Sequence, residues 1–465
     1  MRRVAVIGGG LSGLSAAYQL AQNAQVEPTL FEASTRLGGI VETVRRDGFI
    51  VECGPDSWVT EKSWARELAI ELGLEAELIP SNDERRRTYL LQQGQLIPMP
   101  DGMRMMTPTD PASVVDCPLF SAQARLAYQR EPQRASQLKA AALKGNEDES
   151  VASFVRRHFG DEVARTIAGP LLSGVFGGDI EALSVRAVMP AFVEMEREHG
   201  SLIAALQSRA RASKNAVFTT LRSGLGTLIE RLAESLPRGC VRLDNGILAI
   251  ERMERGWYLR TTARKRDADE IFDAVIVAAP PEVARLLLRR VDEQFDSLMA
   301  MQATSAIVVA LAFTPEQARG LQVPRGFGYL VPKQPGNDSQ LLACTFVDQK
   351  FPHRVPKGGI LLRGFFGGET AAPLLNEADE TLSALAIRGI AEANGPLPAP
   401  HFSVVRRWPR SLPQYGVGHL ERMARLQALL ASCPGLYLAG NTCCGVGLPD
   451  VVREGREAAR RAAQA

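Results

Sequence analysis

The chain has 465 residues, 45% of them hydrophobic, and its 54 lysines and arginines nearly balance its 52 aspartates and glutamates, giving a net charge of +2. This length and composition allow large buried cores, which excludes intrinsic disorder and a miniature fold held by disulfides. The charge balance also excludes a strong overall positive potential of the kind that binds nucleic acid. An anionic ligand must therefore be bound by a few local cations.

The cysteines and the apolar stretches point to a reducing compartment. Seven cysteines lie between Cys53 and Cys444 without a metal-spaced C-x-x-C pair, so we expect reduced thiols and no metal site. Glycines interrupt the N-terminal apolar run, so no secretory signal is expected, and no run reaches the roughly 18 apolar residues that a spanning helix needs. We expect a cytoplasmic protein that is either free or peripherally attached to a membrane.

The first residues of the chain predict a βαβ unit. Residues 3–7 form a continuous apolar run that stops at three glycines, and helical periodicity begins at Leu11. Residues 26–31 form a second β-rich run, which ends at Glu32. Parallel strands joined through a helix are buried on both faces, so these segments predict an α/β fold.

The rest of the chain shows three kinds of segment. Residues 273–279 and 435–440 resemble further buried parallel strands, and residues 151–212 show helical periodicity. Residues 304–366 hold short β-like runs at 306–313, 327–331, 340–347 and 359–366, whereas residues 101–115, rich in Met and Pro, are expected to be irregular. We predict a discontinuous Rossmann-like dinucleotide-binding domain at 1–80, 218–290 and 405–465, a sheet-based substrate-binding domain at 81–100 and 291–404, and a helical insertion domain at 101–217 that could face a membrane.

The turn between the first strand and the first helix carries the pattern Gly8-x-Gly10-x-x-Gly13. Gly8 permits a sharp turn, Gly10 lets the backbone approach a pyrophosphate, and Gly13 lets the helix pack closely on the sheet. The phosphates would meet unpaired N–H groups at the helix N-terminus, and Glu32 could accept hydrogen bonds from both ribose hydroxyls. That carboxylate would repel a 2′-phosphate, which disfavours NADP. The alternative is an ordinary glycine-rich turn.

A second glycine pair separates FAD from NAD. Arg36-Leu37-Gly38-Gly39 follows the acid and would bring the chain close to a second part of a long dinucleotide, unless it is a plain loop. The run from Val4 through Glu32 to Gly39 resembles the FAD-binding opening of the flavin amine oxidase and porphyrinogen oxidase superfamily. The resemblance implies that the Arg-x-Gly-Gly segment lies along the pyrophosphate and that the Rossmann-like domain binds FAD.

Further segments narrow the resemblance to protoporphyrinogen and coproporphyrinogen oxidases. They follow in order at residues 47–57, 169–184, 194–202, 326–332, 407–422 and 440–450. The chain departs from the family where Thr442-Cys443-Cys444 replaces an Ala-Tyr or similar pair and where Gly follows His199. The Ser-Gly-Gly-Cys attachment pattern of some amine oxidases is missing, so FAD is expected to be bound non-covalently.

The resemblance implies a set of cofactor-binding residues at both ends of the chain. They are Gly8, Gly10, Leu11, Ser12, Gly13, Glu32, Ala33, Arg36, Gly38, Gly39, Gly54, Pro55, Asp56, Gly440, Asn441, Val446, Gly447 and Leu448.

The chemistry implied by the resemblance is the oxidation of a porphyrinogen to a porphyrin in heme biosynthesis. The substrate is either coproporphyrinogen III or protoporphyrinogen IX, and six electrons leave in three two-electron steps, with O2 as acceptor and H2O2 as by-product. Because the flavin carries this chemistry, no side chain is assigned as catalytic, and His199 and His419 are expected to be structural. A ferrochelatase is a candidate downstream partner, and a homodimer is a candidate assembly.

A porphyrinogen pocket should be apolar, with a few cations at its mouth. By resemblance, Phe327 would pack against a pyrrole ring with Gly328 and Leu330 beside it, and the backbone carbonyl of Gly174 would take a pyrrole proton. The alternatives are an ordinary core phenylalanine in a hairpin and a helix-ending glycine.

The triplet Arg85-Arg86-Arg87 offers candidate cations for the propionates, in Arg86 and Arg87. The alternative is a solvated surface patch. Many protoporphyrinogen enzymes carry an arginine where this chain has Thr88, and the small hydroxyl residue tilts the expectation towards coproporphyrinogen III.

Two other functions remain open from the sequence. A flavin amine oxidase or a carotenoid desaturase shares the opening fingerprint, although the middle and C-terminal motifs count against both. A flavoprotein without turnover that carries a porphyrin is a third possibility.

Overall fold

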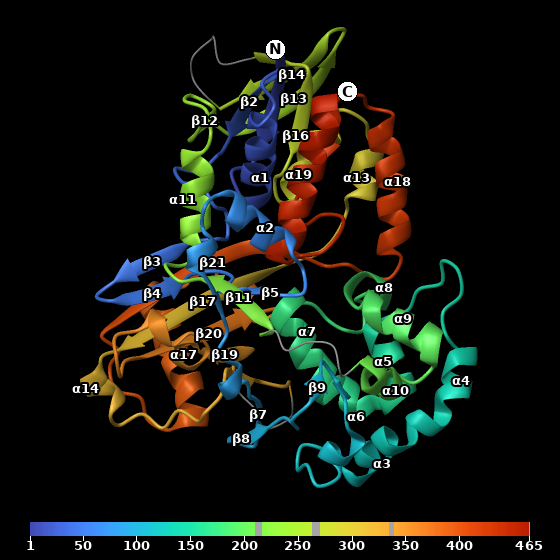
Figure 1. Ribbon diagram of the computed structural model, residues 1–465, viewed down its shortest axis with the longest axis vertical. Helices are drawn as coiled ribbons and strands as arrows, with labels where there is room; N and C mark the ends of the chain where they lie inside the picture. Colours follow the sequence, from blue (N-terminus) through green and yellow to red (C-terminus); the bar gives the residue numbers. More distant parts are fainter. Residues whose placement is uncertain (210–215, 263–269, 334–338, 465) are drawn as a thin grey trace.

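The computed structural model describes residues 1–209, 216–262, 270–333 and 339–464 (Figure 1). Within these ranges the chain forms two large sheets and a helical region, each built around its own hydrophobic core. The predicted α/β fold class is therefore confirmed.

The parallel sheet is built from apolar runs at both ends and in the middle of the chain. β1 (Arg2–Ile7) pairs in parallel with β2 (Val26–Phe31) and with β16 (Ala274–Val277), which confirms three predicted strands. β22 (Leu436–Leu438), the fourth predicted strand, pairs with β16, and β12 (Val241–Arg242) pairs with β2 at the other edge. Segments more than 400 residues apart thus share one sheet.

Both faces of this sheet are covered, as strands that are apolar on both sides require. One face, which includes Val4 and Val6, packs against α1 (Leu11–Ala21), α2 (Trp64–Glu71), α11 (Gly226–Glu234) and α19 (Leu448–Gln464). The other face, which includes Ile7 and Val277, packs against β13 (Ile247–Met253), β14 (Gly256–Thr261), β15 (Glu270–Phe272), α12 (Pro281–Leu288), α13 (Gln294–Leu298) and α18 (His419–Ala431).

The second large sheet is mixed, and its described strands follow the order β21, β17, β20, β19, β18, β7 and β8. They are β21 (Phe402–Pro413), β17 (Ala303–Phe313), β20 (Ile360–Gly367), β19 (Ala343–Phe346), β18 (Gly328–Leu330), β7 (Thr88–Gln92) and β8 (Gln95–Pro98). The four β-like runs predicted between residues 306 and 366 are all strands here. Two of these strands, β18 and β19, are shorter than predicted, and β19 ends at Phe346 because the chain turns directly into α15 (Val347–Lys350).

The long strand β21 was not predicted from the sequence. It contains Pro409, which cannot donate a ladder hydrogen bond, but β21 is an edge strand, where that missing donor is tolerated. It pairs with β17 over most of its length, so residues 405–413 lie in this second sheet.

The second sheet has one face towards helices and one towards the rest of the molecule. α17 (Asp379–Asn394) packs on a face that includes Tyr329, Cys344 and Leu362. The opposite face carries Ala310 and Leu361, which pack against the hairpin of β3 (Thr43–Arg46) and β4 (Phe49–Glu52). The short helices α14 (Pro315–Ala318) and α16 (Ala371–Leu374) contact β17 of this sheet. A separate three-stranded sheet has the order β5 (Trp58–Val59), β11 (Phe218–Leu221) and β6 (Leu78–Pro80).

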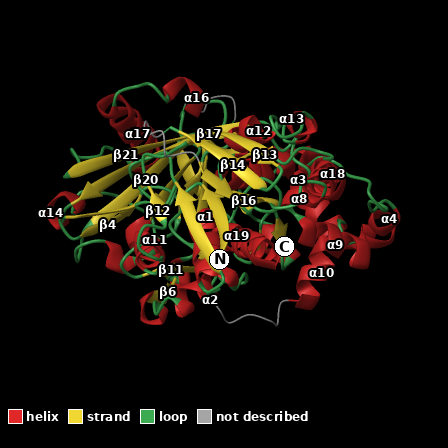
Figure 2. Cartoon of the chain, turned by 90° about the horizontal axis from the view of Figure 1, so that it is seen from above, coloured by secondary structure: helices red, strands yellow, loops and turns green. Residues whose placement is uncertain are grey.

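The helical region gathers on the side of the molecule away from β21 and β4, as Figure 2 shows. It consists of α3 (Ala122–Arg130), α4 (Ala135–Ala140), α5 (Val151–Phe159), α6 (Asp161–Val163), a π-helical turn (Ala164–Ala168), α7 (Gly169–Phe176), α8 (Val185–Val188), α9 (Pro190–His199) and α10 (Leu202–Arg209). Before it, β9 (Met103–Arg104) and β10 (Thr107–Pro108) form a two-residue pairing in the segment predicted to be irregular. None of the helices in the described part of the chain is long and apolar enough to cross a membrane.

Candidate active site

In the glycine-rich turn after β1, each of the three glycines is needed for a different structural reason. Gly8 adopts φ +108°, and a Cβ there would lie 2.6 Å from the Ala278 carbonyl oxygen. A Cβ on Gly13 would overlap the carbonyl oxygen of Gly8, so only glycine lets α1 start this close to the strand. A Cβ on Gly10 would meet only the Gly39 Cα, at 4.0 Å. Gly10 therefore borders open space, as expected where a pyrophosphate approaches the backbone.

The predicted second glycine pair lies directly against this turn. Gly38 donates its N–H to the Gly9 carbonyl at 2.8 Å, and Gly10 and Gly38 form an isolated parallel bridge. The Arg36 guanidinium donates to the Gly39 carbonyl at 2.5 Å and lies over the Trp408 ring, 5.6 Å from its centroid. The structure thus brings together the two segments that the sequence assigned to one dinucleotide.

Glu32 stands at the end of β2 with its carboxylate fixed in place. Its two oxygens accept hydrogen bonds from the Gly9 N–H at 2.6 Å and from the Ser34 N–H and hydroxyl at 2.8 and 2.7 Å. A carboxylate has about four acceptor positions, so one remains for a ribose hydroxyl. Ala33 beside it is exposed.

The predicted cofactor-binding residues of the C-terminal segment lie near the glycine-rich turn because α19 lies alongside α1 (Figure 1). A Cβ on Gly455 would overlap the Ser12 carbonyl oxygen, and Leu448 joins Leu11 in one core. Gly440 adopts φ +96° with nothing within 4 Å of a Cβ. The remaining candidates Asn441, Val446 and Gly447 lie between β22 and α19.

Two aromatic rings hold the segment that contains Asn441. The Tyr415 hydroxyl donates to the Asn441 carbonyl at 2.6 Å, and His419 Nε2 donates to the Cys443 carbonyl at 2.9 Å. The two rings stack with centroids 4.2 Å apart, and burial lowers the pKa of His419. These contacts are consistent with a structural role for His419, which stays a prediction. His199 is half-exposed beside Glu198, at 3.5 Å.

A flavin dinucleotide fits what these residues leave free. The Ser12 and Thr442 hydroxyls are buried and have no hydrogen-bond partner, and they lie in the two segments predicted to bind FAD. Gly10 and Gly440 border open space. Unsatisfied buried hydroxyls cost free energy unless a ligand completes them, so the site has both the room and the donors for an anionic dinucleotide.

The third predicted cofactor segment, Gly54 to Asp56, packs against the second glycine pair. A Cβ on Gly54 would overlap the Ile40 carbonyl oxygen. Asp56 pairs with Lys350 at 2.9 Å and with Arg363 at 3.4 Å. Burial opposes ionisation of Asp56, but these two cations hold its pKa below the ordinary value.

The substrate candidates from the two halves of the site face one another. Gly174 lies inside α7, and the nearest atom to a Cβ placed on it is Leu330 Cδ2, at 3.8 Å. The helix ends at Gly177, with φ +65°, so the alternative of a helix-ending role for Gly174 is wrong. Phe327 is buried and immediately precedes β18, and Gly328 adopts φ +145° against the Cys344 carbonyl.

The arginine triplet lies beside the Phe327 strand. Phe327 donates its N–H to the Arg87 carbonyl at 2.8 Å. The Arg87 side chain is half-exposed near Asp101 at 3.6 Å, and the Arg86 side chain is half-exposed near Asp83 at 3.8 Å. Arg86 also lines a cavity of about 710 Å³ with Arg104 and Pro80. The Arg86 and Arg87 side chains are thus partly exposed, and each has an acidic side chain nearby.

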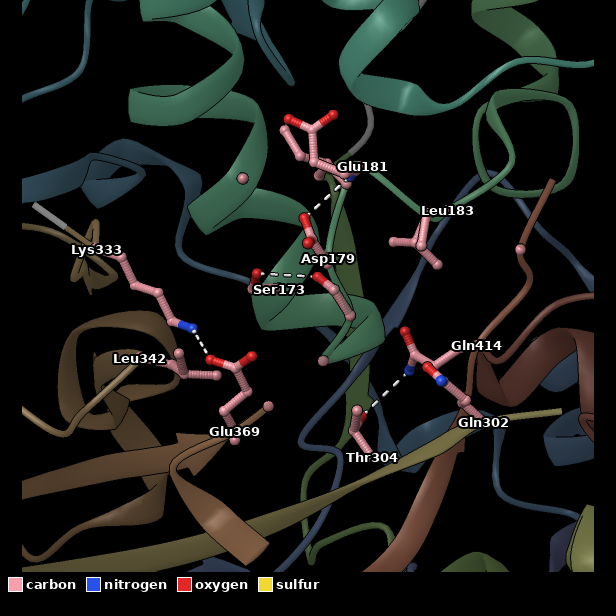
Figure 3. A pocket seen from close by; sticks show the side chains of 18 of the residues that line it. Ser173, Asp179, Glu181, Leu183, Gln302, Thr304, Lys333, Leu342, Glu369 and Gln414 are labelled. Atoms are coloured by element: carbon pink, nitrogen blue, oxygen red, sulfur yellow. Dashed lines mark hydrogen bonds and ion pairs between the residues drawn. The ribbon is translucent and has the colours of Figure 1, made fainter.

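A second cavity, of about 860 Å³, opens between α7 and the second sheet (Figure 3). Its lining includes the Lys333–Glu369 ion pair at 2.9 Å, and Gln414, whose amide donates to the Thr304 hydroxyl at 3.2 Å. None of the predicted site residues is among the residues that line it.

Sequence reasoning missed the charged side chains behind the site. Lys350, Arg354 and Arg363 are all buried, and each pairs with a carboxylate around 300 residues away in sequence. The available signal was Arg363, a lone charge inside the apolar strand run ILLRGFFG.

Comparisons with known proteins agree with this arrangement. The model of the flavin containing amine oxidoreductase family matches residues 11–463. The chain is 34% identical to the coproporphyrinogen III oxidase of Bacillus subtilis, over 98% of this chain and 97% of that protein. It is 29% identical to that of Staphylococcus aureus, over 98% of each. A crystal structure of a putative protoporphyrinogen oxidase from Exiguobacterium superposes with a TM-score of 0.84 at 31% identity, covering 99% of this chain and 98% of that one. The chain therefore belongs to the flavin-containing amine oxidoreductase family of FAD-dependent enzymes, in the branch that includes the coproporphyrinogen III and protoporphyrinogen oxidases.

Proposed function

We propose that this protein oxidises a porphyrinogen to a porphyrin in heme biosynthesis, with FAD as its cofactor. The observation that carries the proposal is that the Ser12 and Thr442 hydroxyls, in the two segments that fit a flavin dinucleotide, are buried and without a hydrogen-bond partner. The substrate candidates Gly174 and Leu330 lie opposite each other at van der Waals distance. Its end-to-end similarity to coproporphyrinogen III oxidases supports the same reaction.

The cofactor site of the proposal uses both ends of the chain. The turn from Gly8 to Gly13 and the segment from Arg36 to Gly39 hold the pyrophosphate, and Glu32 accepts a ribose hydroxyl. The segments 54–56 and 440–448 complete the site, and FAD is bound non-covalently. The proposed domain division has the FAD-binding domain at 1–80, 218–290 and 405–465, although residues 405–413 belong to β21 of the second sheet.

The protein supplies position, shape and charge around the reacting carbon. FAD, when bound, would supply the acceptor for a hydride, which carries two electrons and one proton, from a bridging carbon of the macrocycle. Loss of that hydride would leave one positive charge on the macrocycle. A pyrrole N–H that is hydrogen-bonded to the backbone carbonyl of Gly174 would then release its proton to water. Phe327 packs on a pyrrole ring, and the buried Gly328 with the partly buried Leu330 limits the access of water to the reacting carbon.

We infer coproporphyrinogen III as the substrate, with O2 as the acceptor and H2O2 as the by-product. Thr88, at the start of β7, pairs with Gly328, so the small hydroxyl residue lies beside the substrate strand. Arg86 at its cavity is the first candidate for a propionate contact. A tetracarboxylate presents more anionic groups to such a cation than a dicarboxylate does.

The test is a porphyrin-fluorescence assay with coproporphyrinogen III and protoporphyrinogen IX side by side, with a polyamine and phytoene as alternative substrates. The proposal requires porphyrin formation that depends on added or bound FAD, and a higher kcat/KM for coproporphyrinogen III. Turnover of the polyamine or phytoene alone would assign a different flavoenzyme. Porphyrin binding without turnover would assign a carrier.

The role of Arg86 is separable in the same assay. Arg86→Glu should lower kcat/KM for the tetracarboxylate by about tenfold or more, and lower it less for the dicarboxylate, because a charge-assisted contact is worth about 1.5 to 3 kcal/mol. Arg165→Glu, which changes an exposed arginine at the other cavity, is the control. Equal kinetics for both variants and the wild type would show that Arg86 is a solvated surface residue that does not contact the substrate.

A further inference from the structure

Five charged side chains form a buried cluster between the Gly54–Asp56 segment and the second sheet. Glu52, Lys350, Arg354 and Arg363 are each at least nine-tenths buried, and the Asp56 side chain is 13% exposed. Buried charges are costly unless they are paired and hydrogen-bonded, so a cluster of this size is a feature that needs an explanation.

The first half of the cluster surrounds Asp56. Lys350 Nζ lies 2.9 Å from one Asp56 oxygen and 3.0 Å from the Ser57 hydroxyl. It also sits 4.4 Å from the centroid of the Phe218 ring, a cation–π distance. Arg363 lies 3.4 Å from the other Asp56 oxygen and donates to the Gly54 carbonyl.

The second half of the cluster surrounds Glu52 and is joined to the first by one hydroxyl. Arg354 pairs with Glu52, whose oxygens also accept the Leu225 N–H and the Thr43 hydroxyl, both at 2.7 Å. Arg354 donates to the Thr220 hydroxyl at 2.8 Å, and that hydroxyl donates to the Asp56 carbonyl at 2.8 Å. The cluster is one connected network.

The charges in this network do not cancel. Three cations face two carboxylates, so the network carries one positive charge in excess. Burial pulls the pKa of Lys350 below its ordinary value and Asp56 opposes that shift. An excess charge in a low-dielectric interior acts over a longer distance than one in solvent.

The sheet register relates this excess charge to the proposed active site. Arg363 in β20 lies directly opposite Thr345 in β19, and Thr345 lies directly opposite Gly328 in β18. These three positions are therefore on the same face of the sheet. Leu330, two residues after Gly328, lies on the same face and is the residue opposite Gly174. The buried Thr345 hydroxyl and Arg363 Nε have no hydrogen-bond partner.

The other side of the network touches the proposed cofactor site. Arg363 holds the Gly54 carbonyl, and Gly54 packs on Ile40, the residue after Gly39, which borders Gly10. The excess positive charge is therefore anchored to the chain segments assigned to FAD and shares a sheet face with the residues assigned to the substrate.

We propose that Lys350 and Arg363, held by Asp56, are positioning residues that favour the reduced state of the cofactor through the excess positive charge of this network. The inference rests on the proposed function, because it takes the segments 36–39 and 54–56 as contacts of FAD. A cofactor that accepts a hydride gains one negative charge, and nearby fixed positive charge stabilises that state relative to the oxidised one.

The test compares variants that change the charge of the network in opposite directions. Lys350→Met removes a positive charge, and Asp56→Asn removes a negative charge from the same contact. Measured by equilibration with a redox dye, the reduction potential of bound flavin should fall in Lys350→Met and rise in Asp56→Asn. A tenfold change in the ratio of reduced to oxidised flavin corresponds to about 30 mV for a two-electron couple.

Two further variants separate charge from damage to the fold. Lys350→Arg keeps the charge and should leave the potential near that of the wild type. The double variant Asp56→Asn/Lys350→Met restores the excess of one positive charge, so its potential should also return towards the wild-type value. Glu196→Gln neutralises a fully buried carboxylate of the helical region and should leave the potential unchanged.

Each outcome decides the question. Potentials that move in opposite directions in the two single variants and return in the double variant support the inference. Unchanged potentials, or shifts in the same direction in both single variants, overturn it, because a structural role would weaken FAD binding without a signed response to charge. A wild-type protein that does not bind FAD would instead overturn the proposed function.

Discussion

Tyr415 and His419 stack face to face, 4.2 Å apart, and each donates a hydrogen bond to a backbone carbonyl of the segment 441–443. Tyr415 also accepts the Ser184 N–H with its own carbonyl at 2.8 Å. This pair thus ties the helical region and α18 to the C-terminal segment that we assign to FAD.

We expect Tyr415→Phe to weaken FAD binding while the fold is kept. The substitution leaves the partly buried Asn441 carbonyl without its donor, and losing one hydrogen bond costs about 1 kcal/mol, or roughly fivefold in Kd. Titration of the apoprotein with FAD measures this change. Tyr437→Phe, which removes a hydroxyl bonded to the Arg461 carbonyl on the outside of the molecule at 3.3 Å, should not alter FAD affinity. Equal affinities for both variants would remove the Tyr415 hydroxyl from the cofactor site.

The glycines of the first turn should separate folding from cofactor binding. Gly13→Ala places a Cβ on the Gly8 carbonyl, so we expect loss of soluble protein or a strongly lowered Tm. Gly10→Ala meets nothing closer than 4.0 Å, so the apoprotein should fold with a normal Tm but bind FAD weakly. Tm of the apoproteins and FAD titration check both statements. Normal FAD affinity in Gly10→Ala would mean that the open space beside it does not hold the pyrophosphate.

Gly174→Ala should raise stability and lower activity. Alanine is favoured over glycine inside a helix by about 0.5 to 1 kcal/mol, and the nearest atom is 3.8 Å away, so Tm should rise slightly. The added methyl group would lie against Leu330 at the proposed substrate contact, so kcat/KM for the porphyrinogen should fall by about tenfold or more. Ser173→Ala, the neighbouring change that faces the other cavity, should leave kcat/KM unchanged. An unchanged kcat/KM in Gly174→Ala would show that the substrate does not bind beside Gly174 of α7.

Asp348→Asn should stabilise the protein above neutral pH. Burial raises the pKa of the Asp348 carboxyl to about 6. The long hydrogen bond from the Leu361 N–H, at 3.4 Å, a bond to its own backbone N–H and the charge of Arg85 oppose this only in part. The native state therefore binds a proton more tightly than the unfolded state, and stability is lost as pH rises from the ordinary pKa of 3.8 through 6.

The shift corresponds to at most about 3 kcal/mol at pH 8 and about half of that at pH 5. The gain in Tm from Asp348→Asn should therefore be larger at pH 8 than at pH 5. Asp296→Asn, at an exposed carboxylate whose pKa Arg285 lowers, should give no such gain. A gain for Asp348→Asn that does not depend on pH would exclude the ionisation cost.

The sequence predicted the parts of the fold whose signals are local. The strands around β1, β2 and β16 were visible as apolar runs, and the glycine spacing predicted which side of the turn stays open. β21 was missed because arginines and Pro409 interrupt its pattern, and only its edge position makes that pattern acceptable.

The interior charges of the site could not be predicted because their partners are distant in sequence. Arg363 and Asp56 are each unremarkable alone, and their pairing depends on β20 lying behind the segment that follows β4. The domain boundaries and the contacts of the arginine triplet stay predictions for the same reason, since they depend on arrangements that no local motif records.

The most direct test of the account is an anaerobic mixing experiment with the FAD-loaded protein and coproporphyrinogen III. If the bound cofactor oxidises the porphyrinogen, the flavin absorbance should bleach while absorbance from oxidised porphyrin species appears. Admitting O2 should then restore the flavin absorbance and complete porphyrin formation. A flavin that stays oxidised with coproporphyrinogen III and with protoporphyrinogen IX would contradict the proposed function.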